Sequence, residues 1–119
     1  MLILAVDDTR SLLELLVMTL RQAGHEVVQA TDGLEAQERF AERRPDLIIS
    51  DLNMPNCDGI EFTRACRAMP ESAGVPIIIL TTETDPDLKA EARRAGASAW
   101  MNKPFDPTTL LGLVDRMAA

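Results

Sequence analysis

Short apolar segments alternate with longer segments of helical periodicity along the chain, and this alternation limits the possible folds more than any other feature. The apolar runs predict strands at residues 2–6, 26–30, 47–50, 75–80 and 97–101. Apolar side chains at helical spacing predict helices at residues 9–23, 34–43, 60–69, 86–95 and 106–117. Strands that alternate with helices form a parallel sheet covered by helices on both faces. We therefore predict an α/β fold, a doubly wound (βα)5 sheet in a three-layer sandwich.

The length and composition fit one domain over residues 1–119. The chain has 119 residues, of which 46% are hydrophobic, and this is enough to bury one sizeable core. The two cysteines, Cys57 and Cys66, form no CxxC pair, so free thiols in a reducing compartment are expected. No apolar stretch approaches the length of a membrane span. We expect a cytoplasmic protein that does not enter the membrane.

The net charge of −7 restricts the classes of partner. Binding to nucleic acid depends on cations that neutralise phosphates, so direct nucleic-acid binding is not expected. Docking on anionic lipid is disfavoured for the same reason. A divalent cation or a basic protein surface is compatible with this charge.

Polar and charged side chains follow four of the predicted strands directly. Asp7 and Asp8 follow the first strand, Asp51 the third, Thr81 the fourth and Lys103 the fifth. The carboxyl ends of parallel strands share one edge of the sheet, where ligands bind in such folds. We therefore expect these side chains to converge at one site.

Several carboxylates at one site repel one another, and a hard divalent cation relieves that repulsion. Mg²⁺ favours one or two carboxylates together with water and a phosphate oxygen. A lysine and a threonine hydroxyl add the positive charge and the hydrogen-bond donor that a transferring phosphoryl group needs. The pattern indicates an aspartyl-phosphate site with Mg²⁺ as its cofactor.

The chain resembles the receiver domains of two-component response regulators, most closely the CheY-like single-domain type with its flavodoxin-like fold. The resemblance covers nearly the whole chain and rests on motifs in a fixed order: Val6-Asp7-Asp8, Asp51 through Gly59, Pro76 through Thr81, Gly96-Ala97 and Lys103-Pro104-Phe105. It implies a switch that is phosphorylated rather than a true enzyme.

The resemblance implies a role for each site residue. Asp51 accepts the phosphoryl group, and Thr81 and Lys103 contact its oxygens. The metal ligands are Asp8 directly, Asp7 mainly through water, Asp51, and the backbone carbonyl of Asn53.

The resemblance also concerns the backbone and the lifetime of the phosphoryl group. The Lys103–Pro104 peptide bond corresponds to one that is cis in the family. We expect Gly59 to provide a positive φ in the turn after the phosphoacceptor loop. Asn53 and Glu83 flank the pocket and are expected to tune the lifetime of the acyl phosphate.

Trp100 occupies the position of the aromatic switch residue, which in the family moves inward together with the threonine corresponding to Thr81. Tryptophan is larger than the usual tyrosine or phenylalanine. Thr82 is likewise bulkier than the alanine or glycine often found beside the switch threonine. These are the two departures from the family pattern.

Simpler interpretations of the same residues stay open. Asp7 and Asp8 could cap the first helix, Asp51 could be a turn residue, Thr81 an ordinary strand residue, and Lys103 a surface lysine. Trp100 could be a packing residue at the edge of the sheet.

Two other function classes compete with the signalling switch. One is a phosphohydrolase of the haloacid-dehalogenase kind, but the second aspartate of its Asp-x-Asp motif is missing here. The other is a flavodoxin-like cofactor binder or a degenerate receiver, yet the chain lacks a phosphate loop and keeps every key site residue.

The expected partners are a sensor histidine kinase as the phosphoryl donor and a downstream protein. A flagellar motor switch protein, hence chemotaxis, is the leading candidate. A phosphorelay intermediate or a phosphate sink is the alternative. We expect a monomer.

Overall fold

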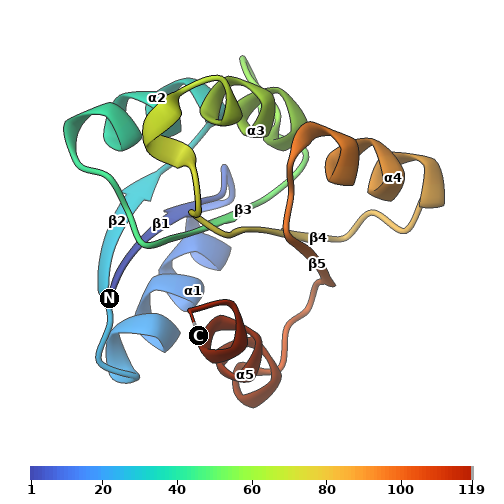
Figure 1. Cartoon of the computed structure of the whole chain (residues 1–119). Helices are drawn as coiled ribbons and strands as arrows, with labels where there is room; N and C mark the ends of the chain where they lie inside the picture. The colour runs from blue at the N-terminus through green and yellow to red at the C-terminus, as the bar shows by residue number, and fades with distance from the viewer. Residues whose placement is uncertain (119) are drawn as a thin grey trace.

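The structure, a computed structural model, describes residues 1–118 (Figure 1). Five β–α units follow one another in the order β1 (Leu2–Val6), α1 (Arg10–Gln22), β2 (Glu26–Ala30), α2 (Gly33–Glu42), β3 (Leu47–Ser50), α3 (Gly59–Arg67), β4 (Ile77–Thr81), α4 (Pro86–Ala95), β5 (Ala99–Asn102) and α5 (Pro107–Ala118). A short 3₁₀ helix, η1 (Pro70–Ser72), lies between α3 and β4.

The strands form one parallel sheet in the order β2-β1-β3-β4-β5. Helices α1 and α5 cover one face, and α2, α3 and α4 cover the other (Figure 1). The direction of the chain across the sheet reverses at β1, between β2 and β3, as a doubly wound topology requires. The predicted α/β three-layer fold is confirmed.

Each strand of the sheet feeds two cores because successive side chains point to opposite faces. In β1, Ile3 and Ala5 pack with α1 and α5, whereas Leu4 and Val6 pack with α2, α3 and α4. Strands β1, β3 and β4 are buried along their whole length. This burial on both faces explains why their sequences are continuous apolar runs.

Most element boundaries lie within two residues of the prediction, and the deviations have local causes. The strand expected from residue 75 begins at Ile77, because the Val75 carbonyl bonds to a guanidinium group and Pro76 lacks an N–H. The strand expected from residue 97 begins at Ala99, because the N–H of Ala97 caps α4 by bonding to Ala92. The 3₁₀ helix was not predicted.

Aspartates cap the three helices on one face of the sheet. Asp32 caps α2 and Asp85 caps α4, while Asp58 and Glu61 form a reciprocal capping box at the start of α3. Asp58 thus belongs to the turn before α3, and its carboxylate is used there. Helix α4 ends at Gly96, whose φ of 117° is the left-handed conformation that favours glycine.

The amino ends of the strands are closed by contacts between charged side chains and the backbone. The Arg67 guanidinium donates to the carbonyl oxygens of Gly96, Ser72 and Val75 at 3.1, 2.8 and 2.7 Å. Arg44 donates to the carbonyls of Glu71 and Ala73. One Asp46 carboxylate oxygen accepts from the Leu2 N–H at 2.7 Å.

Cys57 and Cys66 are both free and buried within the described residues. Across residues 1–118, no helix combines the length and the apolar character that crossing a bilayer requires.

Candidate functional site

The predicted site residues converge at the carboxyl edge of the sheet. Asp7 and Asp8 follow β1 and Asp51 follows β3, and one carboxylate oxygen of each lies within 4.8 Å of those of the other two. Thr81 is the last residue of β4 rather than the residue after it. Lys103 directly follows β5.

Lys103 joins two of the aspartates. Its Nζ lies 2.6 Å from an oxygen of Asp7 and 3.3 Å from an oxygen of Asp51. All three side chains are nearly inaccessible to solvent, with exposures of 9%, 4% and 10%. The surface-lysine interpretation of Lys103 is therefore wrong. The peptide bond from Lys103 to Pro104 is cis.

Backbone hydrogen bonds fix the position of Asp51. Its N–H donates to the Val6 carbonyl, and one carboxylate oxygen accepts from the N–H of Leu52 at 2.7 Å. Burial raises the pKa of Asp51 above its ordinary value, with Lys103 opposing the shift and Asp7 adding to it. The second carboxylate oxygen faces Lys103.

Asp7 has a structural contact as well as an ionic one. Its second oxygen accepts from the N–H of Thr9 at 2.9 Å, so Asp7 bonds to the residue that precedes α1. This local bond coexists with the ion pair to Lys103. Asp8 is the exposed member of the three.

The strand-end threonine faces the interior. Thr81 is fully buried, and its hydroxyl oxygen accepts from the N–H of Glu83 at 3.2 Å. The Glu83 carboxylate in turn accepts from the Asn53 side-chain amide at 2.9 Å. The two residues expected to flank the pocket therefore meet across its mouth.

Asn102 is a site residue that the sequence reasoning missed. Its side-chain amide donates to the carbonyls of Thr81 and Glu83 at 3.3 and 2.7 Å, and so joins the loop after β4 to the end of β5. The available signal was an asparagine directly before the strand-end lysine, at the same edge as Thr81.

The reason expected for Gly59 is wrong. Its φ is not positive; the positive φ in this loop belongs to Asn56, at 68°. Gly59 is needed because a Cβ there would overlap the carbonyl oxygen of Asp51. The glycine lets the start of α3 approach Asp51 closely.

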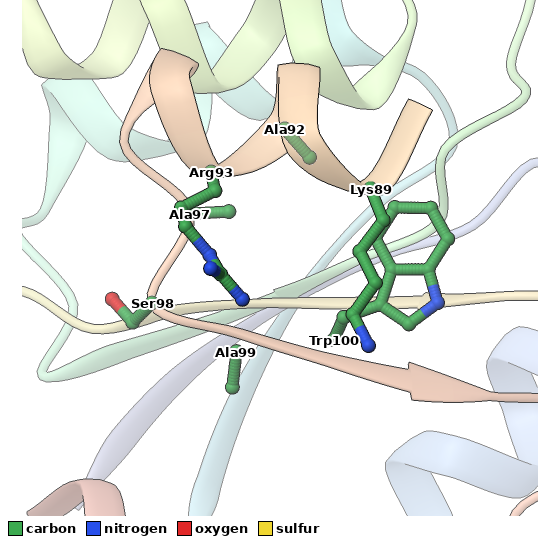
Figure 2. A pocket seen from close by; sticks show the side chains of 7 residues that line it. All are labelled: Lys89, Ala92, Arg93, Ala97, Ser98, Ala99 and Trp100. Carbon is green, nitrogen blue, oxygen red and sulfur yellow. The ribbon is translucent and has the colours of Figure 1, made fainter. Parts of the chain in front are cut away.

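Trp100 lies in the edge strand β5 below α4. With Lys89, Arg93 and Ser98 it lines a cavity of about 50 Å³, and Figure 2 shows the Lys89 chain beside the indole ring. The side chain is half-buried and packs against the core under α2, α3 and α4. Thr82 is exposed and lines a different groove, next to Lys103.

The donor set fits a magnesium ion. Three carboxylates supply oxygen ligands, which Mg²⁺ prefers. A single lysine does not balance three acidic groups, so a bound divalent cation would reduce their repulsion. Asp8 and Asp51 would hold the ion, with Asp7 and the backbone carbonyl of Asn53 beside it.

Comparison with known proteins identifies the family. The model of the response regulator receiver domain matches residues 3–115. The chain therefore belongs to the receiver domains of two-component response regulators, a signalling family. The phosphohydrolase and flavin-binding alternatives are set aside.

Curated relatives include regulators named for DNA binding or transcription. The DNA-binding response regulator MtrA of Mycolicibacterium paratuberculosis is 38% identical over 94% of this chain. The transcriptional regulatory protein PrrA of Mycobacterium bovis is 39% identical over 98% of it. The chain spans about half the length of each of these relatives, 48%.

Solved structures include proteins of similar length. The chemotaxis protein CheY4 of Vibrio cholerae is 45% identical, with a TM-score of 0.93 and coverage of 98% of this chain and 97% of that chain. The receiver domain of the sensor histidine kinase PA1611 from Pseudomonas aeruginosa is 30% identical, with a TM-score of 0.91 over 98% and 96% of the two chains. That structure holds a magnesium ion in its active-site cleft.

Proposed function

We propose that Asp51 accepts a phosphoryl group from a sensor histidine kinase, and that the phosphorylated domain presents a changed surface to a downstream protein. The observation that carries this proposal is the position of Lys103, within 3.3 Å of Asp51 and 2.6 Å of Asp7. A lysine between a nucleophilic carboxylate and a metal-binding carboxylate is suited to hold phosphoryl oxygens.

The transfer is a displacement at phosphorus. The Asp51 oxygen that faces Lys103 forms the new P–O bond, the P–N bond to the donor histidine breaks, and the imidazole leaves with its electron pair. Leu52 N–H fixes the other carboxylate oxygen, so the attacking oxygen keeps its direction. Lys103 and Thr81 contact the transferred oxygens. Asp8 and Asp51 would hold Mg²⁺, with Asp7 beside it, and the ion would supply positive charge to the transferred oxygens.

A groove beside the site supports a helical donor protein as the docking partner. It encloses about 250 Å³ and joins Asp7 and Lys103 to an apolar wall. The wall includes Leu12 and Leu15 of α1, which are 37% and 48% exposed, together with Pro104 and Phe105. An amphipathic helix carrying the phosphohistidine could cover these leucines while its phosphoryl group reaches Asp51.

The output proposed first is binding to a flagellar motor switch protein in chemotaxis. Support comes from CheY4, to which this chain is 45% identical over 97% of that chain. A phosphorelay intermediate or a phosphate sink is the alternative, since both use the same site. We also propose that residues 1–119 form one receiver domain that is monomeric, lies in the cytoplasm and does not bind nucleic acid.

Trp100 and Thr81 are proposed as the coupled switch. Both lie on the face of the sheet that α4 covers, because alternation along β4 puts Thr81 on the side of Ile79, the register partner of Trp100. On that face Trp100 lines a cavity with Lys89 and Arg93 (Figure 2). Movement of the Thr81 hydroxyl toward a phosphoryl oxygen would free space for the indole ring. The cationic rim would then present an altered surface to an acidic partner.

The test uses the purified protein with Mg²⁺ and acetyl phosphate. Intact-mass spectrometry should show one added phosphoryl group in the wild type and none without Mg²⁺. Beryllofluoride should change Trp100 fluorescence and allow capture of the downstream partner. A protein that gains no phosphoryl mass under these conditions would contradict the proposal.

A further inference from the structure

The phosphoacceptor loop, residues 51–59, is held more firmly on one side than on the other. Toward β4 and α4, its apex has one side-chain hydrogen bond, from Asn53 to Glu83. Toward α2, three hydrogen bonds join it to the N-cap residue and the first two turns of that helix. This asymmetry singles out the start of α2, which none of the site assignments includes.

The three hydrogen bonds involve both backbone and side chains. The Gly33 N–H donates to the Cys57 carbonyl at 3.0 Å. The Asn56 side-chain amide donates to a carboxylate oxygen of Asp32 at 3.1 Å. The Gln37 amide lies 3.5 Å from the Cys57 sulfur.

Asp32 serves two segments at once. One of its oxygens accepts from the Glu35 N–H and caps α2, while the other accepts from Asn56. Both bonds lower the pKa of Asp32. Asn56 itself has a φ of 68°, a conformation that is uncommon outside glycine, so its side-chain bond helps to hold the loop in this shape.

The start of α2 and the phosphoacceptor loop are in tight van der Waals contact at Gly33 and Cys57. A methyl group added at Gly33 would lie 2.5 Å from both the carbonyl oxygen and the sulfur of Cys57. Any shift of the α2 N-terminus therefore displaces Cys57. Because the Gly59 N–H closes the loop onto the Leu52 carbonyl at 2.8 Å, the displacement reaches the residues between them, including Asn53.

We propose that the first turn of α2, Asp32 and Gly33, positions the phosphoacceptor loop and thereby sets the Mg²⁺ affinity and the phosphoryl lifetime of the site. This inference rests on the proposed function, because it concerns the same metal and the same acyl phosphate. Asp32 and Gly33 act through Asn56, Cys57 and Asn53, so they are positioning residues.

Two variants remove the same contact from opposite sides. Asp32→Ser keeps an oxygen that can cap α2 but loses the bond to Asn56. Asn56→Gly tolerates the positive φ but loses the bond to Asp32. Gly33→Ala is the complementary probe, because it pushes Cys57 rather than releasing Asn56. Asp106→Ser, which alters a capping aspartate near the start of α5, is the matched control for helix capping.

Three measurements are made on each variant: amide hydrogen exchange at residues 53–57, the Mg²⁺ concentration for half-saturation, and the decay rate of the acyl phosphate. We expect Asp32→Ser and Asn56→Gly each to speed exchange and to weaken Mg²⁺ binding about tenfold, the low end of the effect for outer contacts of a metal site. The double variant should equal either single one. Gly33→Ala should alter the decay rate, and Asp106→Ser should leave all three readouts unchanged.

The outcomes separate this inference from the proposed function. Variants that lower the urea midpoint but leave hydrogen exchange and Mg²⁺ affinity unchanged would overturn the positioning role. Additive effects in the double variant would also overturn it, because they would show two independent contacts. If the wild type accepts no phosphoryl group, the proposed function fails, while exchange and Mg²⁺ binding still judge the positioning role.

Discussion

The carboxyl edge of the sheet gathers three aspartates, two of which contact Lys103, whereas at the amino edge Arg67 and Arg44 bond to backbone carbonyls. At the amino edge, the charged side chains of Asp46, Arg44 and Arg67 form hydrogen bonds with the protein's own backbone. At the carboxyl edge, the acidic groups outnumber the cation that touches them. The contrast shows how one sheet separates stability from binding. At the amino edge the charged groups stabilise the fold, and at the carboxyl edge an excess of negative charge is available to bind a cation.

The largest difference between the two edges should appear when one aspartate at each edge is replaced by asparagine. Asp51→Asn should abolish phosphoryl incorporation, because an amide cannot act as the nucleophile. Asp46→Asn at the amino edge should retain it, since Asp46 only accepts from the Leu2 N–H. Intact-mass spectrometry with acetyl phosphate and Mg²⁺ measures both. Retained incorporation in Asp51→Asn would place the acceptor elsewhere.

Removing the cation of the carboxyl edge should come next. We expect Lys103→Met to slow phosphorylation about 100-fold, as for loss of one donor to a transition-state oxygen. It also leaves Asp7 and Asp51 facing each other without their shared ammonium group. Added Mg²⁺ should therefore stabilise this variant more than the wild type. Stopped-flow fluorescence and thermal unfolding with and without Mg²⁺ provide the measurements, and an unchanged rate would contradict the assigned role.

The matched change at the amino edge is Arg67→Met. It leaves three carbonyl oxygens without their guanidinium donor, and we expect the free energy of unfolding to fall by about 3 kcal/mol. Phosphorylation should keep the wild-type rate. Urea unfolding and the mass assay test both parts, with Arg67→Lys as a control that keeps the charge but not the forked geometry. Loss of phosphorylation in a folded Arg67→Met protein would break the comparison.

A smaller effect is expected at the mouth of the site. Glu83→Ala removes the acceptor of the Asn53 amide, and Asn53→Asp replaces that contact with two facing carboxylates. Each should change the dephosphorylation rate about threefold to tenfold without abolishing phosphorylation. Decay of the acyl phosphate after rapid removal of the donor gives the rate. Identical decay rates in both variants and the wild type would show that Asn53 and Glu83 do not affect the lifetime of the acyl phosphate.

The smallest expected effect uses the two cysteines as reporters of local opening. Burial raises the pKa of the Cys66 thiol to about 11 and also raises that of Cys57. The reactive thiolate is therefore scarce at pH 8, and alkylation of both should be slow in the folded protein. Cys57 lies in the phosphoacceptor loop and Cys66 within α3, so Cys57 should react several-fold faster. Peptide mapping after timed iodoacetamide treatment measures both alkylation rates. Faster alkylation of Cys66 than of Cys57 would contradict the prediction and indicate that the amino edge is the more mobile.

The sequence predicted the carboxyl edge better than the amino edge for a physical reason. Parallel strands bring their ends together whatever the helices do, so Asp7, Asp51 and Lys103 could be placed at one site from the strand pattern. Their geometric convergence was expected, while their chemical roles stay predictions. The contacts of Arg67 require three separate segments of the chain to meet in space. The spacing of apolar residues along the sequence does not predict such contacts.

The phosphoacceptor loop illustrates the same limit at short range. A glycine in a turn predicted a positive φ at Gly59, yet Asn56 carries it. The close approach of the Gly59 backbone to Asp51 depends on how α3 packs, which the local sequence does not specify. Asn102 was missed because its acceptors are carbonyls at the end of β4 and in the loop that follows it.

The ion pair between Asp7 and Lys103 joins residues 96 positions apart in the chain. During synthesis the aspartate emerges early, and its lysine partner follows only after all five strands have left the ribosome. A growing chain therefore carries an incomplete pocket until β5 docks beside β4. The site is therefore complete only when the last strand has joined the sheet, and a chain truncated before residue 103 would lack the cation that pairs with Asp7 and Asp51.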